Sequence, residues 1–411
     1  MTWRFEARDL RTGVLLAHDV PLGSVRWRQA FAGKTVRSEL SARIDLGVGR
    51  SEIVDPILLL SDDDQPLLTD DDQQLTVGEE IVPVSGTAGL LAALRPGRSV
   101  IWCYRDSTVR DGLIVWERDK PMGSRRLEVR CLGLLSYFAR RILRVTKTYT
   151  QVDQATIARD LINAAQASAG GDIGVVVPST PLTGVLRDRQ PLAYSFERKN
   201  IGQLVDQLAA VIGGFEVSID SSLVDDAPRA TFRVWYPRKG RTVGQSNLLM
   251  IRSGDQSGNL LDYALGEHVA ANAVHGIGAG EGTSMLLTVS TDTAPIDQGW
   301  PLLDDYVAHK DVSVLSTLRS HADERLAEGQ RSTQRWQLRV DPGDPMMPFG
   351  TWRVGDDSRL VIEDDDRFPA GPNGEPGMST VVRIVGQTVT VPDDGGPEHV
   401  VLDAETVGGD V

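Results

Sequence analysis

Two glycine-containing segments of this 411-residue sequence resemble loops that bind nucleotide phosphates. Residues 33–35 (GKT) match the end of a phosphate-binding loop. However, Arg28 stands where that loop needs another glycine, and the pattern that follows predicts a strand instead of a helix. In the run 276–282 (GIGAGEG), Glu281 occupies the third glycine position of a dinucleotide fingerprint. We therefore predict a turn at the first segment and a glycine-rich hairpin or close chain crossing at the second.

The potential metal ligands are not spaced as in known metal sites. Cys103 and Cys131 are 28 residues apart, and no two histidines have the i, i+4 spacing of a helical zinc site. Acidic runs at 62–64, 70–72 and 363–366 lack the alternating ligands and mid-loop glycine of a calcium hand, although clustered carboxylates leave adventitious cation binding open. We predict no metal site and no cofactor. The histidines are His18, His268, His275, His309, His321 and His399.

The sequence also predicts no catalytic residue. It contains no Gly-x-Ser-x-Gly motif for a serine nucleophile, while a glycosidase-like pair of carboxylates stays open because the fold sets such pairs. Segment 95–150 has 13 Lys/Arg against 5 Asp/Glu, interleaved with aromatics such as Trp102 and Trp116. On strands, this mixture favours buried aromatics and outward arginines over a nucleic-acid-binding surface.

The composition is typical of a folded, turn-rich β protein of about three domains. Hydrophobic residues make up 41%, charged residues 24% and aromatics 6%, with 41 glycines and 21 prolines. The net charge of −14 opposes general binding to nucleic acid or anionic membranes. The first residues lack the apolar core of a signal peptide, and no stretch approaches the ~20 apolar residues of a membrane span. Two cysteines are too few for a disulfide framework, so we expect a soluble protein made in the reducing cytoplasm.

Alternation of apolar and polar residues predicts strands in the first third of the chain. Residues 3–8 and 36–46 have a period of two, so each strand is expected to bury one face, with Glu6 pointing outward. Further strands are predicted at 99–105, 112–117 and 126–132.

The middle of the chain has helical spacing. Residues 150–153 (TQVD) have the form of a capping box, and an apolar face follows over 155–165. Asn200 is predicted to cap a second helix, whose apolar stripe over 201–212 ends at the glycines 213–214. A hairpin is predicted from strands at 215–219 and 231–236.

The β pattern returns after Asp262, with one helix among the strands. The spacing of Leu315, Leu318 and Ala322 predicts that helix, which Gly329 ends. Strands are predicted at 268–277, 284–290, 333–340, 351–354, 359–363, 379–391 and 398–403.

The order of these motifs resembles the minor tail proteins of siphophages that infect actinobacteria, which are similar to the central hub of phage baseplates. The similarity extends from Trp3 to about Asp403, and it depends on the order of the motifs because none is diagnostic alone. The motifs are 101–106 (IWCYRD), 112–116 (GLIVW), 127–129 (LEV), 133–141 (GLLSYFARR), 200–204 (NIGQL), 214–216 (GFE), the glycine run after Asn272, 349–350 (FG) and 353–356 (RVGD).

The resemblance implies a mainly β fold in which two β-barrel-like domains are separated by a small α+β region. The expected domains are residues 1–147, the α+β residues 148–262, and residues 263–411 with a helical insertion at about 300–332. Because the chain ends at residue 411, we expect it to lack the lytic or fibre-like extensions of some hubs.

The function implied is structural, without enzymatic activity. A homotrimeric hub would join the sixfold tail tube of a long non-contractile tail to the tail tip and pass DNA at ejection. Its expected partners are the distal tail protein or tail tube, the tape-measure protein, and receptor-binding or tip proteins. It would assemble in the host bacterial cytoplasm and reside at the virion tail tip. The alternatives are a peripheral receptor-binding tail protein and a cell-wall or capsule hydrolase.

Charge is unevenly distributed along the chain. Segment 95–150 has a net charge of +8, whereas 341–411 has 4 Lys/Arg against 15 Asp/Glu, a net charge of −11. Such a chain is suited to docking on copies of itself or on oppositely charged neighbours, although charges scattered outward from β surfaces would give the same counts. We expect acidic residues, with the C-terminal excess as the candidate, to line the bore so that DNA slides past.

Overall fold

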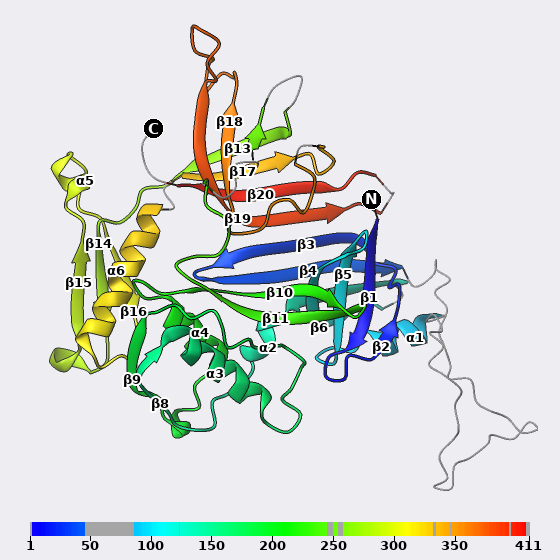
Figure 1. The fold of residues 1–411 in the computed structure, drawn as a ribbon, viewed down its shortest axis with the longest axis horizontal. Coiled ribbons are helices and arrows are strands. Elements are labelled where there is room, and N and C mark those ends of the chain that lie inside the picture. Colours follow the sequence, from blue (N-terminus) through cyan, green and yellow to red (C-terminus); the bar gives the residue numbers. More distant parts are fainter. Residues whose placement is uncertain are drawn as a thin grey trace, which may run out of the picture.

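The computed structural model shows a mainly β protein with short helices, as predicted (Figure 1). Its described strands form a 15-stranded sheet, a 3-stranded sheet and a 2-stranded sheet. No helix in this described part is long and apolar enough to cross a membrane. The structure describes residues 2–45, 86–122, 124–244, 250–253, 258–331, 334–345, 347–393 and 396–407.

The elements of the first half are β1 (Trp3–Asp9), β2 (Leu15–Ala17), β3 (Gly23–Ala32), β4 (Thr35–Asp45), α1 (Gly86–Ala93), β5 (Ser99–Arg105), β6 (Thr108–Asp119), β7 (Arg126–Gly133), α2 (Leu135–Phe138), β8 (Lys147–Asp153), α3 (Gln154–Gln166), β9 (Leu186–Ala193), η1 (Ser195–Glu197) and α4 (Ile201–Ala209). Those of the second half are β10 (Glu216–Val224), β11 (Ala227–Trp235), β12 (Met250–Arg252), β13 (Leu260–Glu267), β14 (Ala273–Ile277), η2 (Gly282–Ser284), β15 (Leu287–Thr291), α5 (Ala294–Asp297), β16 (Asp304–Ala308), α6 (Leu315–Arg331), β17 (Gln334–Val340), β18 (Asp357–Ile362), β19 (Met378–Val391) and β20 (His399–Thr406).

Strands from the two ends of the chain pair in the large sheet. Its order is β13-β17-β20-β19-β3-β4-β7-β6-β5-β1-β2, and β3 is antiparallel to β19 with Trp27 opposite Val389. Because β13 and β2 lie at the ends of this path, the described strands form no closed barrel. One continuous sheet therefore replaces the two predicted barrel-like units, while the residue ranges of the three domains stay a prediction. The long β19 makes this possible, since it pairs with β18, β20 and β3.

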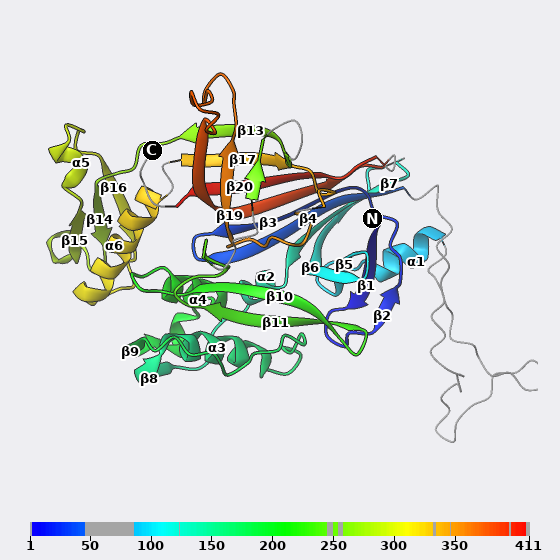
Figure 2. The ribbon, with the colours of Figure 1, turned by 45° about the horizontal axis from the view of Figure 1, so that its top comes forward.

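Strand β5 separates two hydrophobic cores. All seven of its residues are buried, which explains its nearly unbroken apolar sequence. Ile101 and Cys103 face a core shared with β3, β4 and the C-terminal strands, whereas Val100 and Trp102 face a core built from α3, α4, β10 and β11. Figure 2 shows α3 lying beneath the β10–β11 hairpin.

The two middle helices confirm the predicted apolar stripes but begin or end elsewhere. Helix α4 is capped by Asn200, whose side chain accepts from the Gln203 backbone N–H at 3.0 Å, as predicted. It ends at Ala209, so Ile212 is 46% exposed instead of buried. The capping box at 150–153 is wrong, because those residues belong to β8 and Asp153 caps α3.

A small sheet of β15, β14 and β16 forms a separate unit at one end of the molecule, with α6 against one face (Figure 1). Glycines in the run 276–282 allow neighbouring segments of this unit to approach β14 closely. A Cβ atom on Gly276 would lie 2.7 Å from Thr288 Cγ2, and one on Gly278 would lie 2.8 Å from the Val312 carbonyl oxygen. The predicted close chain crossing is therefore confirmed. Helix α6 over Leu315–Arg331 confirms the predicted helix, while its role as an insertion at about 300–332 in a second barrel-like domain stays a prediction.

Two further local predictions are wrong for identifiable reasons. Residues 351–354 form turns instead of a strand, and Gly350 and Gly355 on either side have left-handed φ angles of 101° and 108°. Glu6 is buried, although alternation placed it outward, because it accepts hydrogen bonds from Tyr104 and from arginine neighbours on β1.

Candidate functional site: a charged junction beside two cavities

A buried ion pair joins the middle of the chain to its last part. The Arg383 guanidinium on β19 donates to both carboxylate oxygens of Glu216 on β10, at 3.0 and 2.6 Å. The same carboxylate accepts from the Lys239 backbone N–H at 2.7 Å, and Glu216 is 3% exposed. Bidentate guanidinium–carboxylate pairs fix orientation as well as distance. This contact therefore sets how β10 meets β19.

The backbones of two loops touch beside this ion pair. A Cβ atom on Gly240 would lie 2.1 Å from the carbonyl carbon of Gly355. Asp356, which is 1% exposed, accepts from the backbone N–H of Arg241 at 2.8 Å and from its Nη2 at 2.6 Å. The Arg353 backbone N–H donates to the same carboxylate at 3.0 Å. Glycine at 240 is thus required by close approach as well as by its φ of 92°.

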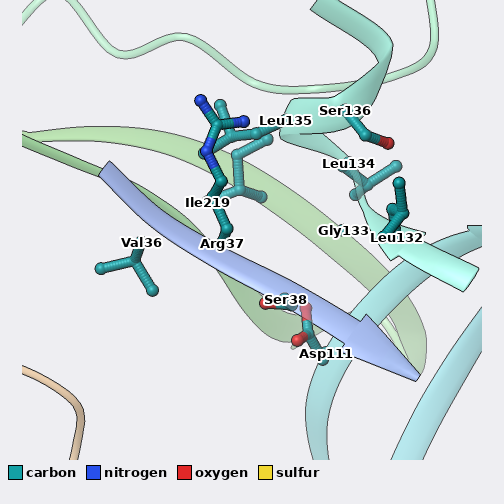
Figure 3. Close-up of a pocket in the computed structure, with 10 residues that line it drawn as sticks. All are labelled: Val36, Arg37, Ser38, Asp111, Leu132, Gly133, Leu134, Leu135, Ser136 and Ile219. Carbon is teal, nitrogen blue, oxygen red and sulfur yellow. The ribbon is translucent and has the colours of Figure 1, made fainter. Parts of the chain in front are cut away.

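A small cavity of about 80 Å³ lies between β4, β10 and the end of β7 (Figure 3). Asp111 and Ser38 lie side by side in the close-up, and Arg37 projects from β4. The Asp111 carboxylate accepts from Trp27 Nε1 at 3.0 Å and from the Gly112 backbone N–H at 2.9 Å. It thereby links β6 to β3 inside the core.

Burial raises the pKa of Asp111 to about 6, and the hydrogen bonds from Ser38, Trp27 and Gly112 offset part of the rise. A carboxyl group with such a pKa is one feature of acid–base sites. The residues that line this cavity include no histidine, cysteine or lysine that would pair with Ser38 as a base or with Asp111 as a second acid. The hydrogen bonds that Asp111 accepts from Trp27 and Gly112 make it a structural link between β6 and β3.

The phosphate-loop-like segment is a turn, as predicted. Gly33 and Lys34 connect β3 to β4, which begins at Thr35, and Gly33 has a φ of 60°. The Lys34 ammonium lies 2.8 Å from a carboxylate oxygen of Glu324 on α6. Lys34 therefore holds the small unit against the large sheet instead of facing a phosphate.

Two of the six histidines, which are dispersed in the sequence, lie in contact. His309 and His321 are stacked with ring centroids 3.9 Å apart, and His321 Nδ1 lies 2.6 Å from the Ala210 carbonyl oxygen. Burial and the neighbouring His309 lower the pKa of His321 to about 4, so His321 is neutral at pH 7. Only tertiary structure reveals this contact, because twelve residues separate the two histidines along the chain.

The acidic run at 363–366 forms a hydrogen-bonded turn. Glu363 pairs with Arg252, and Asp365 accepts from the backbone N–H groups of Arg367 and Phe368 at 2.8 and 2.7 Å. The acidic runs at 62–64 and 70–72 lie outside the described residues. Within the described ranges, no group of three or more His, Cys, Asp or Glu side chains is placed to hold a metal ion. Cys103 and Cys131 are buried free thiols.

Segment 95–150 follows the predicted burial pattern with one exception. Trp102 and Tyr104 are buried, and Arg126, Arg130 and Arg140 are exposed. Arg105 is the exception: it is 3% exposed and pairs with Glu398, a partner from the far end of the chain.

Comparison with solved structures shows the fold. No protein-family model and no curated protein sequence matches this chain. A tail protein from Neisseria meningitidis MC58 is 13% identical with a TM-score of 0.53, over 98% of this chain and 97% of that chain. The prophage MuSo2 43 kDa tail protein from Shewanella oneidensis is 8% identical with a TM-score of 0.56, over 98% of both chains. The chain therefore has the fold of these phage tail proteins.

The close approach at Gly240 yields a first prediction. Gly240→Ala is expected to lower the free energy of unfolding by about 3 kcal/mol, because the methyl group meets the Gly355 backbone and the left-handed φ is strained. Urea denaturation followed by tryptophan fluorescence measures this change. Gly244→Ala is the matched control and should change stability by less than about 0.5 kcal/mol, since nothing lies within 4 Å of its added Cβ. Equal effects of the two variants would refute the loop contact.

Asp111 yields a pH-dependent prediction. Its pKa is raised in the fold, so its favourable contribution to stability is present below about pH 4 and is lost as the pH rises through about 6. The two-unit shift corresponds to about 3 kcal/mol. Asp111→Asn does not titrate and loses one of two acceptors, so it should be less stable than the native protein at pH 4. The difference in free energy of unfolding between the native protein and Asp111→Asn, measured by denaturation curves, should narrow by up to about 3 kcal/mol towards pH 7. A difference that stays constant with pH would contradict the raised pKa of Asp111.

Proposed function

We propose that this chain is the structural hub of a long non-contractile phage tail, a homotrimeric ring that joins the tail tube to the tail tip and passes DNA. The observation that carries the proposal is the match to tail proteins over nearly the whole of both chains. The expected order of β, α+β and β segments along the sequence agrees with it. The proposed partners are the distal tail protein or tail tube, the tape-measure protein, and receptor-binding or tip proteins, with assembly in the host cytoplasm.

An exposed apolar sheet face supports a role in assembly. Helix α6 packs on one side of the small sheet, while Leu287 and Val289 on β15 and Tyr306 on β16 are 61%, 47% and 68% exposed. The registers place Val289 and Tyr306 on either side of His275, so they lie on the same face. Both outer strands of this sheet are edge strands. Apolar faces and open edges of this kind favour contact with another protein.

The charge distribution supports contact between copies or with charged neighbours. The basic segment 95–150 carries the exposed Arg126 and Arg130 on β7, whereas the acidic excess of 341–411 is in the C-terminal part of the chain. Opposite charges on two surfaces steer association and fix register. We propose that acidic side chains line the bore, where they keep DNA from adhering.

The stoichiometry tests the proposal. Native mass spectrometry should give a mass three times that of the 44.7 kDa chain, and electron cryomicroscopy of the tail should show three copies around its axis.

Leu287→Ser with Tyr306→Ser should reduce incorporation into tails at least about ten-fold, because about 3 kcal/mol of apolar burial is lost. Val14→Ser, which alters an exposed apolar residue in the β1–β2 turn, is the control. A monomer located at the tail periphery, or turnover of host envelope by the pure protein, would overturn the proposal.

A further inference from the structure

A second, larger cavity lies at the junction between β6, β10 and the loop 349–353. Its volume is about 180 Å³, and the aromatic side chains of Trp27, Phe349 and Trp352 contribute to its wall. The ionisable groups that line it are Arg110, Asp220, Lys239 and Arg353. Lys239 is paired with Asp220 at 3.2 Å, so the two remaining arginines leave the lining with a net positive charge.

Neither arginine has an ionic partner among the described residues. No described carboxylate lies within 4.0 Å of a guanidinium nitrogen of Arg110 or Arg353. Glu398, whose charge also acts on Arg110, is engaged by Arg105 and accepts from Trp3 Nε1 at 2.7 Å. The pKa of Arg110 is lowered, first by burial and then by the nearby charges of Arg105 and Arg353. Neither guanidinium is therefore neutralised by an ion pair within the described residues, although the charges of Asp106 and Glu398 act on Arg110 from farther away.

Two buried polar atoms of the lining lack hydrogen-bond partners within the described structure. They are Arg110 Nε and Ser221 Oγ, from neighbouring strands β6 and β10. Buried polar atoms in folded proteins nearly always have a partner, so each requires an explanation. Both groups can donate a hydrogen bond to an acceptor.

The arginine is held in place by its surroundings. The Arg110 guanidinium carbon lies 5.2 Å from the centroid of the Phe349 ring. A Cβ atom on Gly350 would lie 2.6 Å from Arg110 Nη1, so only glycine lets the guanidinium lie against this loop. A positioned, half-buried guanidinium presents its donors in a fixed geometry.

We propose that this cavity binds one oxyanion group, a phosphate or a carboxylate, through Arg110, Ser221 and Arg353. The planar guanidinium fork matches the oxygens of both groups. The volume is below the ~300–1,000 Å³ of sites for drug-sized molecules, so a small anion fits and a nucleotide does not. This inference goes beyond the proposed hub function and does not depend on the oligomeric state.

Fluorine NMR of the full chain labelled with 5-fluorotryptophan tests the proposal. Trp27 and Trp352 line the cavity, and Trp→Phe substitutions assign their signals among those of the eight tryptophans. Titration with inorganic phosphate, and separately with acetate, at constant ionic strength should shift both signals saturably. The signal of Trp300, which does not line the cavity, should stay in place. The titration, with phosphate or with acetate, that saturates at the lower anion concentration identifies the preferred anion.

Substitutions make the test specific. Arg110→Gln and Arg353→Gln should each weaken binding about ten-fold or more, because each removes a charged donor. Arg359→Gln, an exposed arginine on β18 outside the cavity lining, should leave it unchanged. If Arg110→Gln fails to fold, the exposed Arg353 carries the test. Shifts that never saturate, or that are equal in Arg353→Gln and the native protein, would mean that water alone fills the cavity and would overturn the proposal.

Discussion

Hydrogen bonding between β3 and β19 joins residues near the two ends of the chain, with Trp27 opposite Val389. The first hydrophobic core depends on this pairing, because it collects side chains from β3 and β4 together with side chains from β17 to β20. This β3–β19 pairing, called the seam below, closes a long loop of the chain. The entropic cost of closing a loop rises only slowly with its length, and the burial of apolar surface on both sides of the seam offsets that cost. The seam therefore makes the two predicted β units parts of a single sheet.

The charged junction gives this sheet a defined attachment to the α+β middle. A buried ion pair such as Glu216–Arg383 is costly to desolvate, so its contribution to net stability is small, but losing one partner leaves a buried charge. The contact thus disfavours other docking arrangements of β10 on β19. The touching backbones at Gly240 and Gly355 have the same effect by sterics. Both constraints suit a protein whose proposed role depends on its shape.

Local features of the fold could be predicted from the sequence, because periodicity and capping act over a few residues. The strand at 35–45, the Asn200 cap and the glycine crossing at 276–282 are examples. The predictions that proved wrong concern residues whose partners are distant in the sequence. Glu6 is buried because arginines and Tyr104 surround it, and the open sheet exists because β19 meets β3. Asp111 and Arg110 gave no signal in the sequence, since contacts such as Trp27 with Asp111 and Phe349 with Arg110 join residues more than eighty positions apart.

Strands from both ends of the chain form the large sheet, and the small sheet carries the exposed apolar face. This architecture requires that the seam between β3 and β19 is as stable as the rest of the large sheet. Amide hydrogen exchange measures this directly. The amides that pair across the seam, such as those near Trp27 and Val389, should exchange as slowly as those between β4 and β7. Early exchange along the seam, with protection kept in β4 and β7, would show two separately folding domains and contradict the account.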